Sequence, residues 1–337
     1  MHIEENKSLK EYNTFHIDCK ARYFVSVSTI EELNKVLANK KFENRFLLGG
    51  GSNMLLTGDI DALVIHLNLK GITILSEDQQ KVNIEVMAGE NWHQFVMFCI
   101  SNNYGGVENL SLIPGNVGTA PIQNIGAYGV ELKDTFVKCN AVEIDTQRER
   151  VFTKTDCNFG YRNSVFKNDL KGKYIITSVV FELTKTDHKK STSYGAIKDK
   201  LAEKNIYDPT IKDISDAVIS IRESKLPDPA KLGNSGSFFK NPVIDSETFR
   251  EFRVKFPEAP FYEVSASQFK IPAGWLIEQA GFKGKQFGDA GVHKNQALVL
   301  VNYGDASGQE IWELAILIQK KIKEMFGIYI EPEVNVI

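Results

Sequence analysis

The sequence predicts an α+β protein with more than one domain, on three observations. The chain has 337 residues, more than one hydrophobic core usually supports, so two or three domains are expected. β-Branched and aromatic residues crowd its middle, whereas both ends alternate helical and strand patterns. The prolines of Lys225-Leu-Pro-Asp-Pro229 forbid helix continuation and mark a domain boundary.

The first seventy residues are expected to form a small α/β element. Thr29-Ile-Glu-Glu32 is a capping box, and the helix after it has an apolar stripe of Leu33, Val36 and Leu37. Phe46–Leu48 is predicted to be a buried strand that runs into Gly49-Gly-Gly-Ser-Asn53, and Ala62–Leu67 to be a further strand.

The middle of the chain is predicted to be rich in strands, namely Asn83–Met87, Val137–Ile144 and Tyr174–Leu183. One helix, from Asn91 to about Asn102, interrupts them. Another is expected over Asp213–Ser224, with Asp213 as its cap and with Ile214, Val218 and Ile221 on one face.

The last third alternates strands and helices, which predicts a separate α/β domain. Pro272 and Gly281 bracket one helix, and Ala297–Val301 is a strand. Ser307-Gly-Gln-Glu310 opens a second helix, which Gly327 ends. The residues expected to point inward from that helix are Ile311, Leu314, Ile318, Ile322 and Met325. The tail Tyr329–Ile337 is expected to be extended.

Composition narrows the functional class. A hydrophobic content of 42% with 25% charged residues is typical of a soluble globular protein, and a net charge of −3 gives no reason to expect nucleic-acid binding. No apolar run approaches the ~20 residues of a membrane span, and the N-terminus lacks the apolar core of a signal peptide. The four cysteines are scattered, so neither a zinc site nor a disulfide framework is expected.

The segment Ile113–Gly129 is the most informative part of the chain. Its seventeen residues include four glycines, two prolines and two asparagines, with no charged side chain. A plain turn needs about four residues, and a surface linker carries charge. The segment therefore predicts a loop whose free N–H groups cradle a ligand.

Gly49-Gly-Gly-Ser-Asn53 resembles a phosphate cradle after a strand. It matches neither the Gly-x-Gly-x-x-Gly dinucleotide pattern nor a Walker loop, so alone it is a weak signal. Together with Ile113–Gly129, it favours a nucleotide or flavin bound between two subdomains.

Three other segments carry candidate chemistry. Gly233–Pro242 places Ser237 between glycines and two phenylalanines; a serine hydrolase is disfavoured because no Gly-x-Ser-x-Gly elbow surrounds it. Gly160–Lys167 holds Arg162, a residue type that grips planar carboxylates, and Glu331-Pro-Glu333 offers carboxylates near the C-terminus.

These segments together resemble the UDP-N-acetylenolpyruvoylglucosamine reductase family. The similar motifs run nearly the whole chain: Asn13-Thr-Phe-His16, Leu48–Asn53, Ile113–Gly129, Tyr161-Arg-Asn-Ser164, Gly236–Pro242, Ala273-Gly-Trp-Leu-Ile277, His293-Lys-Asn-Gln-Ala297 and Glu331-Pro-Glu-Val334. The resemblance implies a three-domain flavoprotein whose FAD-binding unit is of the vanillyl-alcohol-oxidase-like type, with an α/β substrate domain. Residues 1–70 plus 327–337 and residues 71–224 would hold FAD, and residues 225–326 the substrate.

The resemblance also implies a reaction, the reduction of UDP-N-acetylglucosamine enolpyruvate to UDP-N-acetylmuramate by NADPH through non-covalently bound FAD. Arg162 would hold the substrate carboxylate, Glu333 would polarise it, and Ser237 would donate a proton to the carbanion carbon. Such an enzyme is expected to be a cytoplasmic bacterial monomer that acts in peptidoglycan precursor synthesis, without a metal, nucleic acid or membrane as partner.

The resemblance assigns binding residues as well. The flavin contacts would be Gly49, Gly50, Gly51, Ser52, Asn53, Pro114, Gly115, Gly118, Thr119 and Gly126. The substrate contacts would be Tyr128, Tyr194, Lys225, Asn241, Tyr262, Lys283 and Gln296, with Tyr194 on a loop that covers the substrate. Two alternatives remain open at this point: another FAD-dependent oxidoreductase on the same scaffold, and a flavin- or nucleotide-sugar-binding protein without catalysis.

Overall fold

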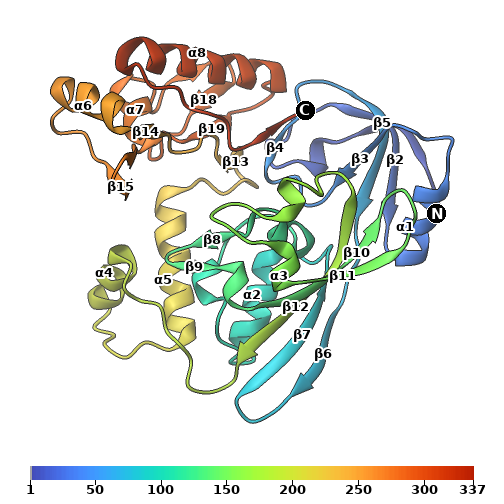
Figure 1. Cartoon of the computed structure of the whole chain (residues 1–337). Helices are drawn as coiled ribbons and strands as arrows, with labels where there is room; N and C mark the ends of the chain where they lie inside the picture. Colours follow the sequence, from blue (N-terminus) through green and yellow to red (C-terminus); the bar gives the residue numbers. More distant parts are fainter. Residues whose placement is uncertain (1) are drawn as a thin grey trace. The chain divides into compact units, whose positions relative to one another are not determined.

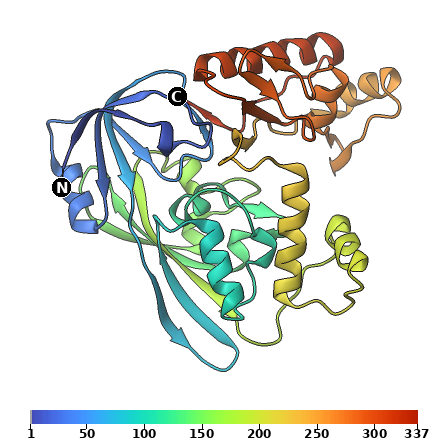
Figure 2. The same ribbon diagram turned by 180° about the vertical axis from the view of Figure 1, so that it is seen from behind.

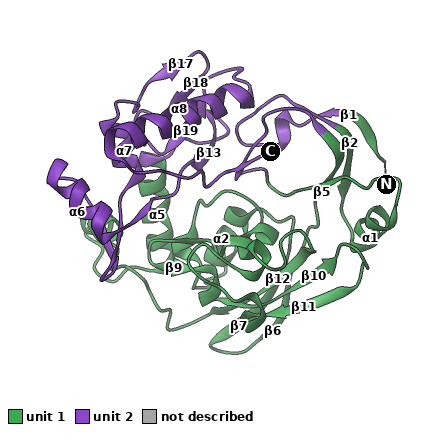
Figure 3. Ribbon diagram, turned by 45° about the horizontal axis from the view of Figure 1, so that its top comes forward, with its two compact units in different colours: residues 1–6, 22–50, 61–223 green, residues 7–21, 51–60, 224–337 purple. Residues whose placement is uncertain are grey.

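A computed structural model describes residues 2–337 of the chain. The chain forms two compact units, each built from three stretches of sequence (Figure 3). Unit 1 comprises residues 1–6, 22–50 and 61–223, and unit 2 comprises residues 7–21, 51–60 and 224–337.

The first sheet has the strand order β1 (Glu4–Ser8), β2 (Lys20–Val27), β5 (Ile60–Leu67) and β3 (Arg45–Leu48), with β3 parallel to β5. Helix α1 (Ile30–Ala38) buries the predicted stripe in a cluster with β2 and β5. Thr29 caps α1 as predicted, because its side chain accepts the Glu32 N–H. The Glu32 carboxylate accepts from the Ser28 N–H and hydroxyl.

The second sheet of unit 1 is antiparallel (Figure 1). Its strand order is β11 (Glu149–Thr153), β10 (Phe136–Glu143), β12 (Tyr174–Thr184), β7 (Lys81–Met87) and β6 (Ile72–Glu77). Helix α2 (Trp92–Ser101) packs on it, and the ring centroids of Trp92 and Phe181 lie 5.9 Å apart. The predicted strands and the helix capped by Asn91 are therefore confirmed.

Short elements complete unit 1. They are η2 (Glu108–Leu110), η3 (Val117–Gln123), β8 (Gly126–Ala127), β9 (Val130–Glu131), η4 (Leu132–Asp134), α3 (Lys154–Cys157), η5 (Val165–Lys167) and α4 (Gly195–Glu203).

Helix α5 (Ile211–Lys225) starts two residues before the predicted position. Thr210, not Asp213, is its cap: the Asp213 N–H donates to Thr210 Oγ1 (3.2 Å), and the Asp213 carboxylate accepts the Thr210 N–H (2.9 Å). The prediction of Asp213 as the cap was wrong because Asp213 fills the other half of a capping box. Figure 2 shows α5 alongside the part of unit 1 that carries α2.

Unit 2 contains an antiparallel sheet with the order β13 (Gly233–Ser237), β19 (Val299–Asn302), β18 (Ala290–Val292) and β17 (Gln286–Phe287). Helices α7 (Ala273–Gln279) and α8 (Gly308–Phe326) accompany it. Ser307 and Gly327 cap α8 as predicted. The predicted inward face of α8 is confirmed except at its end, where Met325 is 38% exposed and Phe326 is buried instead.

A smaller sheet, β14 (Val243–Asp245), β16 (Gln268–Lys270) and β15 (Tyr262–Ser265), adjoins α6 (Ser246–Lys255) in unit 2. The 3-10 helix η1 (Lys10–Tyr12) also belongs to this unit. The C-terminal tail returns to the early part of the chain, because β20 (Asn335–Val336) pairs in parallel with β4 (Met54–Leu55).

Candidate active site

Two turns of unit 1 pack backbone against backbone. A Cβ added to Gly50 would lie 2.8 Å from Asn116 Oδ1 and 3.1 Å from Gly115 Cα. A Cβ on Gly49 would lie 2.9 Å from Thr119 Cγ2. Because real Cβ atoms do not come so close, only glycine lets the turn after β3 reach the 115–119 backbone. The structure thus brings the two predicted glycine motifs together within this unit.

The glycine-rich segment, Ile113–Gly129, is more regular than the predicted loop. It contains η3 and the two-residue strand β8, because its backbone finds partners on the β7–α2 connection. The Gly118 N–H donates to the Ala88 carbonyl (2.9 Å), and the Trp92 N–H donates to the Gly115 carbonyl (2.9 Å). At Gly118 a Cβ would lie 2.4 Å from Ala88 Cβ, so this position also requires glycine.

Gly51, Ser52 and Asn53 belong to unit 2, where the chain termini hold them. Gly51 has a φ of +60°, and a Cβ there would lie 2.0 Å from the Tyr12 carbonyl oxygen. The Asn53 carbonyl accepts the Asn335 N–H (3.2 Å) and its side-chain amide (2.8 Å). The C-terminal tail therefore fixes this turn.

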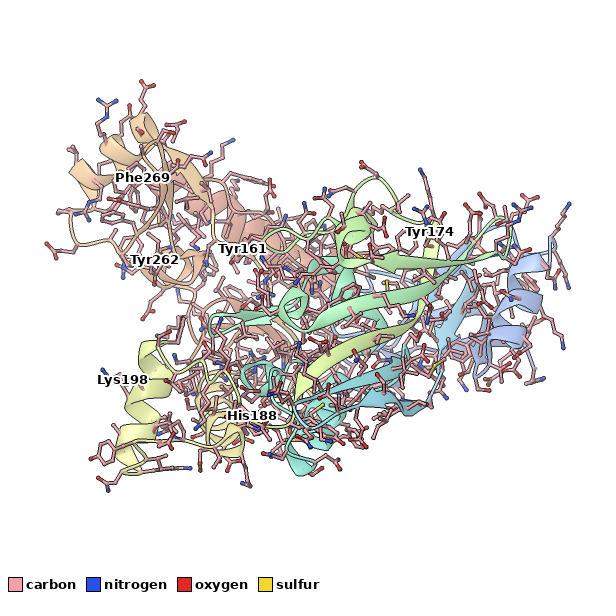
Figure 4. The ribbon with its side chains drawn as sticks, turned by 60° about the horizontal axis from the view of Figure 1, so that its bottom comes forward. Tyr161, Tyr174, His188, Lys198, Tyr262 and Phe269 are labelled. Carbon is pink, nitrogen blue, oxygen red and sulfur yellow. The ribbon has the colours of Figure 1, made fainter. Side chains whose placement is uncertain are left out.

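Arg162 lies in a tight turn that is tied to the glycine-rich segment. Gly160 and Asn163 exchange backbone hydrogen bonds of 3.0 and 3.2 Å, and Arg162 between them has a φ of +52°. The Gly160 carbonyl accepts Asn124 Nδ2 at 3.0 Å, and Ser164 Oγ donates to the Ile122 carbonyl at 2.6 Å. Tyr161, next to Arg162, is 74% exposed (Figure 4). The turn that carries Arg162 therefore lies beside the end of η3.

Ser237 and Glu333 lie on neighbouring extended segments of unit 2. The Glu333 N–H donates to the Phe238 carbonyl (2.8 Å), and Phe239 and Pro332 form an antiparallel bridge. Phe238 and Phe239 are fully buried, which anchors the strand end, while Ser237 is half-buried. The structure therefore places the segment that follows Ser237 next to the segment that carries Glu333.

Two predicted substrate contacts converge on the first turn of α7. Asn241 Oδ1 accepts the Ala273 N–H at 2.9 Å. Gln296 Oε1 lies 3.3 Å from where a Cβ on Gly274 would be. Because the first N–H groups of a helix lack partners within it, side-chain amides fit this position.

The remaining substrate candidates of unit 2 are less enclosed. Lys283 forms an ion pair with Glu278 (2.8 Å), and Lys225 is exposed. Tyr262 is 59% exposed on β15, with the Lys270 ammonium 5.5 Å from its ring centroid. Figure 4 shows Tyr262 near Phe269 of β16.

Tyr128 and Tyr194, the two predicted substrate tyrosines of unit 1, meet each other. Their rings stand edge to face, with centroids 5.3 Å apart and an interplanar angle of 90°. Tyr194 is the N-cap residue of α4 and is 52% exposed, whereas Tyr128 packs against the apolar cluster of α4 and α5. Burial raises the pKa of the Tyr128 hydroxyl.

Arg222 and His93, which the sequence did not single out, also lie at the glycine-rich segment. Arg222 Nε donates to the Leu112 carbonyl (3.2 Å), and its charge interacts with the Tyr128 hydroxyl. His93 Nδ1 accepts the Leu112 N–H at 3.0 Å. Burial lowers the pKa of Arg222, and the Arg162 charge lowers it further. A lone Arg in a predicted helix carries no signal that distinguishes it from a surface residue.

The residues of unit 1 fit a flat cofactor. Gly49, Gly50 and Gly118 are positions where any side chain would collide with neighbouring backbone or side chains, so the turns are bare by construction. Backbone without side chains lets a flat ring approach closely, although the Val117, Gly118 and Thr119 N–H groups donate within the protein rather than to a ligand.

Among residues 2–337, no cluster of His, Cys, Asp and Glu has the arrangement of a metal site. Over the same range, none of the helices joins the length and apolarity needed to cross a bilayer. All four cysteines are buried and unpaired by disulfides.

Comparison with known proteins places the chain in a family. The sequence profile of an FAD binding domain matches residues 21–151, and that of the UDP-N-acetylenolpyruvoylglucosamine reductase C-terminal domain matches residues 228–337. Enzymes named UDP-N-acetylenolpyruvoylglucosamine reductase are 63% identical in Flavobacterium johnsoniae, over the full length of both chains, and 49% identical in Pseudomonas putida, over 98% of each. The crystal structure of the Thermus caldophilus reductase is 23% identical and covers 100% of this chain and 99% of its own, with a TM-score of 0.68, which shows a shared fold.

Proposed function

The chain belongs to the UDP-N-acetylenolpyruvoylglucosamine reductase family, and from this premise we propose that it reduces UDP-N-acetylglucosamine enolpyruvate to UDP-N-acetylmuramate at the expense of NADPH. It is an FAD-containing oxidoreductase of peptidoglycan precursor synthesis. Bound FAD supplies the hydride chemistry between NADPH and the terminal carbon of the enolpyruvyl double bond. Through its product the enzyme serves cell-wall growth, cell shape and division, as a monomer in the bacterial cytoplasm.

The flavin contacts proposed here come from both glycine motifs. Gly49 to Asn53 and the residues Pro114, Gly115, Gly118, Thr119 and Gly126 form stretches of backbone with little side-chain bulk, against which a flavin can lie closely. Support comes from the close approach of Gly50 to Gly115 and Asn116, which no larger residue allows. We also propose three functional domains, formed by residues 1–70 plus 327–337, 71–224 and 225–326. Their bounds differ from those of the two compact units.

Three side chains of this protein are proposed to bind the carboxylate of the substrate and to protonate the carbon next to it. Arg162 holds the carboxylate with its planar guanidinium, which favours the charge that develops there during reduction. Glu333, in its protonated form, polarises that carboxylate by donating a hydrogen bond. Ser237 gives its hydroxyl proton to the carbon next to the carboxylate. The observation that supports these roles is the pairing of residues 238–240 with 331–333, which runs the segment after Ser237 beside the segment that contains Glu333.

The sugar and diphosphate are assigned to the polar residues around α7 and to the tyrosine pair. Asn241 and Gln296 converge on one helix terminus, and two lysines supply charge for a diphosphate. These lysines are Lys225 and Lys283, and Tyr262 joins them. Tyr194 would close over the substrate from α4, with Tyr128 as its ring partner.

Single-turnover kinetics of a Ser237→Ala variant test this function. Flavin reduction by NADPH should match that of the parent, because no proton from Ser237 enters it. Flavin reoxidation by the enolpyruvyl sugar should slow by about 10²- to 10⁴-fold. Ser76→Ala, an exposed serine on β6, is the matched control and should change neither phase. Unchanged reoxidation in Ser237→Ala would remove this serine from the mechanism, and a flavin that the enolpyruvyl sugar never reoxidises in the parent would remove the function.

A further inference from the structure

Two residues at opposite ends of the glycine-rich segment have left-handed backbone without being glycine. Leu112, directly before the segment, has a φ of +58°, and Tyr128, the last residue but one within it, has a φ of +50°. A residue with a Cβ costs free energy in this region, so neighbouring contacts must hold it there. The structure shows which contacts these are.

Leu112 is held on both sides of its peptide backbone. Its N–H donates to His93 Nδ1 at 3.0 Å, and its carbonyl accepts Arg222 Nε at 3.2 Å. Since His93 Nδ1 acts as an acceptor, its ring proton is on Nε2 in the neutral form. Helices α2 and α5 thus each supply one polar clamp to the same strained residue.

Arg222 also reaches the other end of the segment. Its positive charge interacts with the Tyr128 hydroxyl, and the Tyr128 carbonyl accepts Asn109 Nδ2 at 3.2 Å. One side chain therefore contacts the residues that open and close the segment. Figures 1 and 2 show α5 running beside the part of unit 1 that carries β8.

Helix α5 is itself fixed at this place. Ser215 lies two turns before Arg222 on the same helix face, and its hydroxyl is 2.8 Å from that of Ser111. Both serines are fully buried, and Ser111 Oγ also bonds the Glu108 carbonyl at 2.7 Å. This buried pair fixes the position of α5 relative to Leu112. The backbone of Arg222 is thereby held at a defined distance from the Leu112 carbonyl.

We propose that Arg222 and His93 are positioning residues that hold the two ends of the glycine-rich segment in the conformation that binds FAD. Arg222 joins Leu112 to Tyr128, and His93 completes the grip on Leu112. This inference rests on the proposed flavin contacts of the segment. Neither residue needs to touch the flavin, because the effect travels through the backbone of Leu112 and Tyr128.

Hydrogen exchange and flavin affinity of the full-length protein test the two parts separately. Arg222→Met keeps the apolar length of the side chain and removes its donors, and His93→Phe keeps a ring and removes the acceptor. In the FAD-free protein both should raise amide exchange in residues 113–129 by on the order of tenfold or more. In fluorescence titrations with FAD, both should weaken binding by about ten- to hundred-fold.

Three further variants separate positioning from general damage. His93→Asn places an amide oxygen near the position of Nδ1 and should restore exchange and affinity toward the parent values. Arg250→Met removes an exposed guanidinium from α6 and should change neither. Leu112→Gly relieves the left-handed strain, so the affinity loss from His93→Phe should be smaller in that background.

The outcomes distinguish this inference from the function proposed above. Parent-like exchange of residues 113–129 in Arg222→Met and His93→Phe, with parent-like circular dichroism, overturns the positioning role. Raised exchange with unchanged FAD affinity supports the grip on the segment and overturns its link to flavin. If His93→Phe folds, full additivity with Leu112→Gly contradicts the role assigned to strain at Leu112. If it does not fold, His93→Asn decides, because raised exchange of residues 113–129 despite its amide oxygen overturns the role of His93.

Discussion

The glycine-rich segment Ile113–Gly129 and the segment Gly233–Pro242 have similar compositions but are held in different ways. The first lies in unit 1, and polar side chains from α2 and α5 hold strained residues at its ends. The second lies in unit 2, where it forms a strand whose end is anchored by the buried rings of Phe238 and Phe239. A segment with few side chains of its own is held by hydrogen bonds from side chains of other elements. A segment that exposes one hydroxyl is held by the burial of its own apolar residues.

The largest expected effect comes from removing the apolar anchor of the second segment. Phe238 is completely buried, with its ring centroid 6.3 Å from that of Phe15 and 5.1 Å from that of Phe239. Phe238→Ala should lower the free energy of unfolding by about 3–5 kcal/mol, because the lost ring leaves a cavity. Chemical denaturation measures this, with Phe287→Ala, at 40% exposure, as the control that stays within about 0.5 kcal/mol. A cost near zero at Phe238 would mean that the anchor lies elsewhere.

A smaller effect is expected where the first segment meets the turn after β3. Gly50→Ala puts a methyl group 2.8 Å from Asn116 Oδ1 and 3.1 Å from Gly115 Cα, so the two turns must separate. Overpacking of this kind costs about 1–3 kcal/mol, and FAD affinity in a fluorescence titration should fall by about five- to hundred-fold. Gly195→Ala, whose Cβ meets nothing within 4 Å, should keep parent affinity. Equal affinities in the two variants would contradict the proposed cradle.

The smallest expected effect is a pH dependence confined to the first segment. Burial and then the Arg222 charge lower the pKa of His93, while Glu223 opposes them. The folded ring therefore stays neutral below about pH 6.5, the range in which the unfolded chain would take up the proton. The contribution of His93 to stability is complete above about pH 6.5, near the pKa of the unfolded chain. It is lost as the pH falls through the lowered pKa of the folded protein.

Hydrogen exchange, corrected for intrinsic rates, should accordingly show residues 113–129 losing protection by a few-fold as the pH falls below about 6.5. Residues 233–240 serve as the internal reference. Because asparagine does not titrate, His93→Asn should remove the pH dependence while keeping the bond. A dependence that persists in His93→Asn would assign the effect to a different group.

Much of the fold followed from local signals. Thr29, Ser307 and Gly327 stand where capping chemistry predicts helix ends, and β-branched and aromatic residues marked the strands in the middle of the chain. Two predictions were wrong by one to three positions. Thr210, not Asp213, caps α5. Phe326, not Met325, is buried at the end of α8. Such choices depend on contacts one turn away, which a single-residue pattern does not resolve.

The candidate site divides in the same way. Glycine and proline content alone identified Ile113–Gly129, and ordered motifs identified Arg162, Ser237 and Glu333 as candidates. The residues proposed to position the glycine-rich segment, Arg222 and His93, could not be identified from sequence motifs, because both belong to ordinary amphipathic helices. Only the packing of α2 and α5 against Leu112 gives these two residues a role.

By itself the amino-acid order determined where the backbone is bare and where helices begin and end, and its ordered motifs carried the family resemblance that implies the side chains at an unsaturated acid. These are properties of single residues and of spacings of a few positions. Tertiary structure alone decided that Gly50 faces Gly115, that the segment of Phe238 pairs with that of Glu333, and that Arg222 bonds the Leu112 carbonyl before the glycine-rich segment. The reason is that these contacts join residues far apart in the chain, and their formation depends on how the sheets and helices pack.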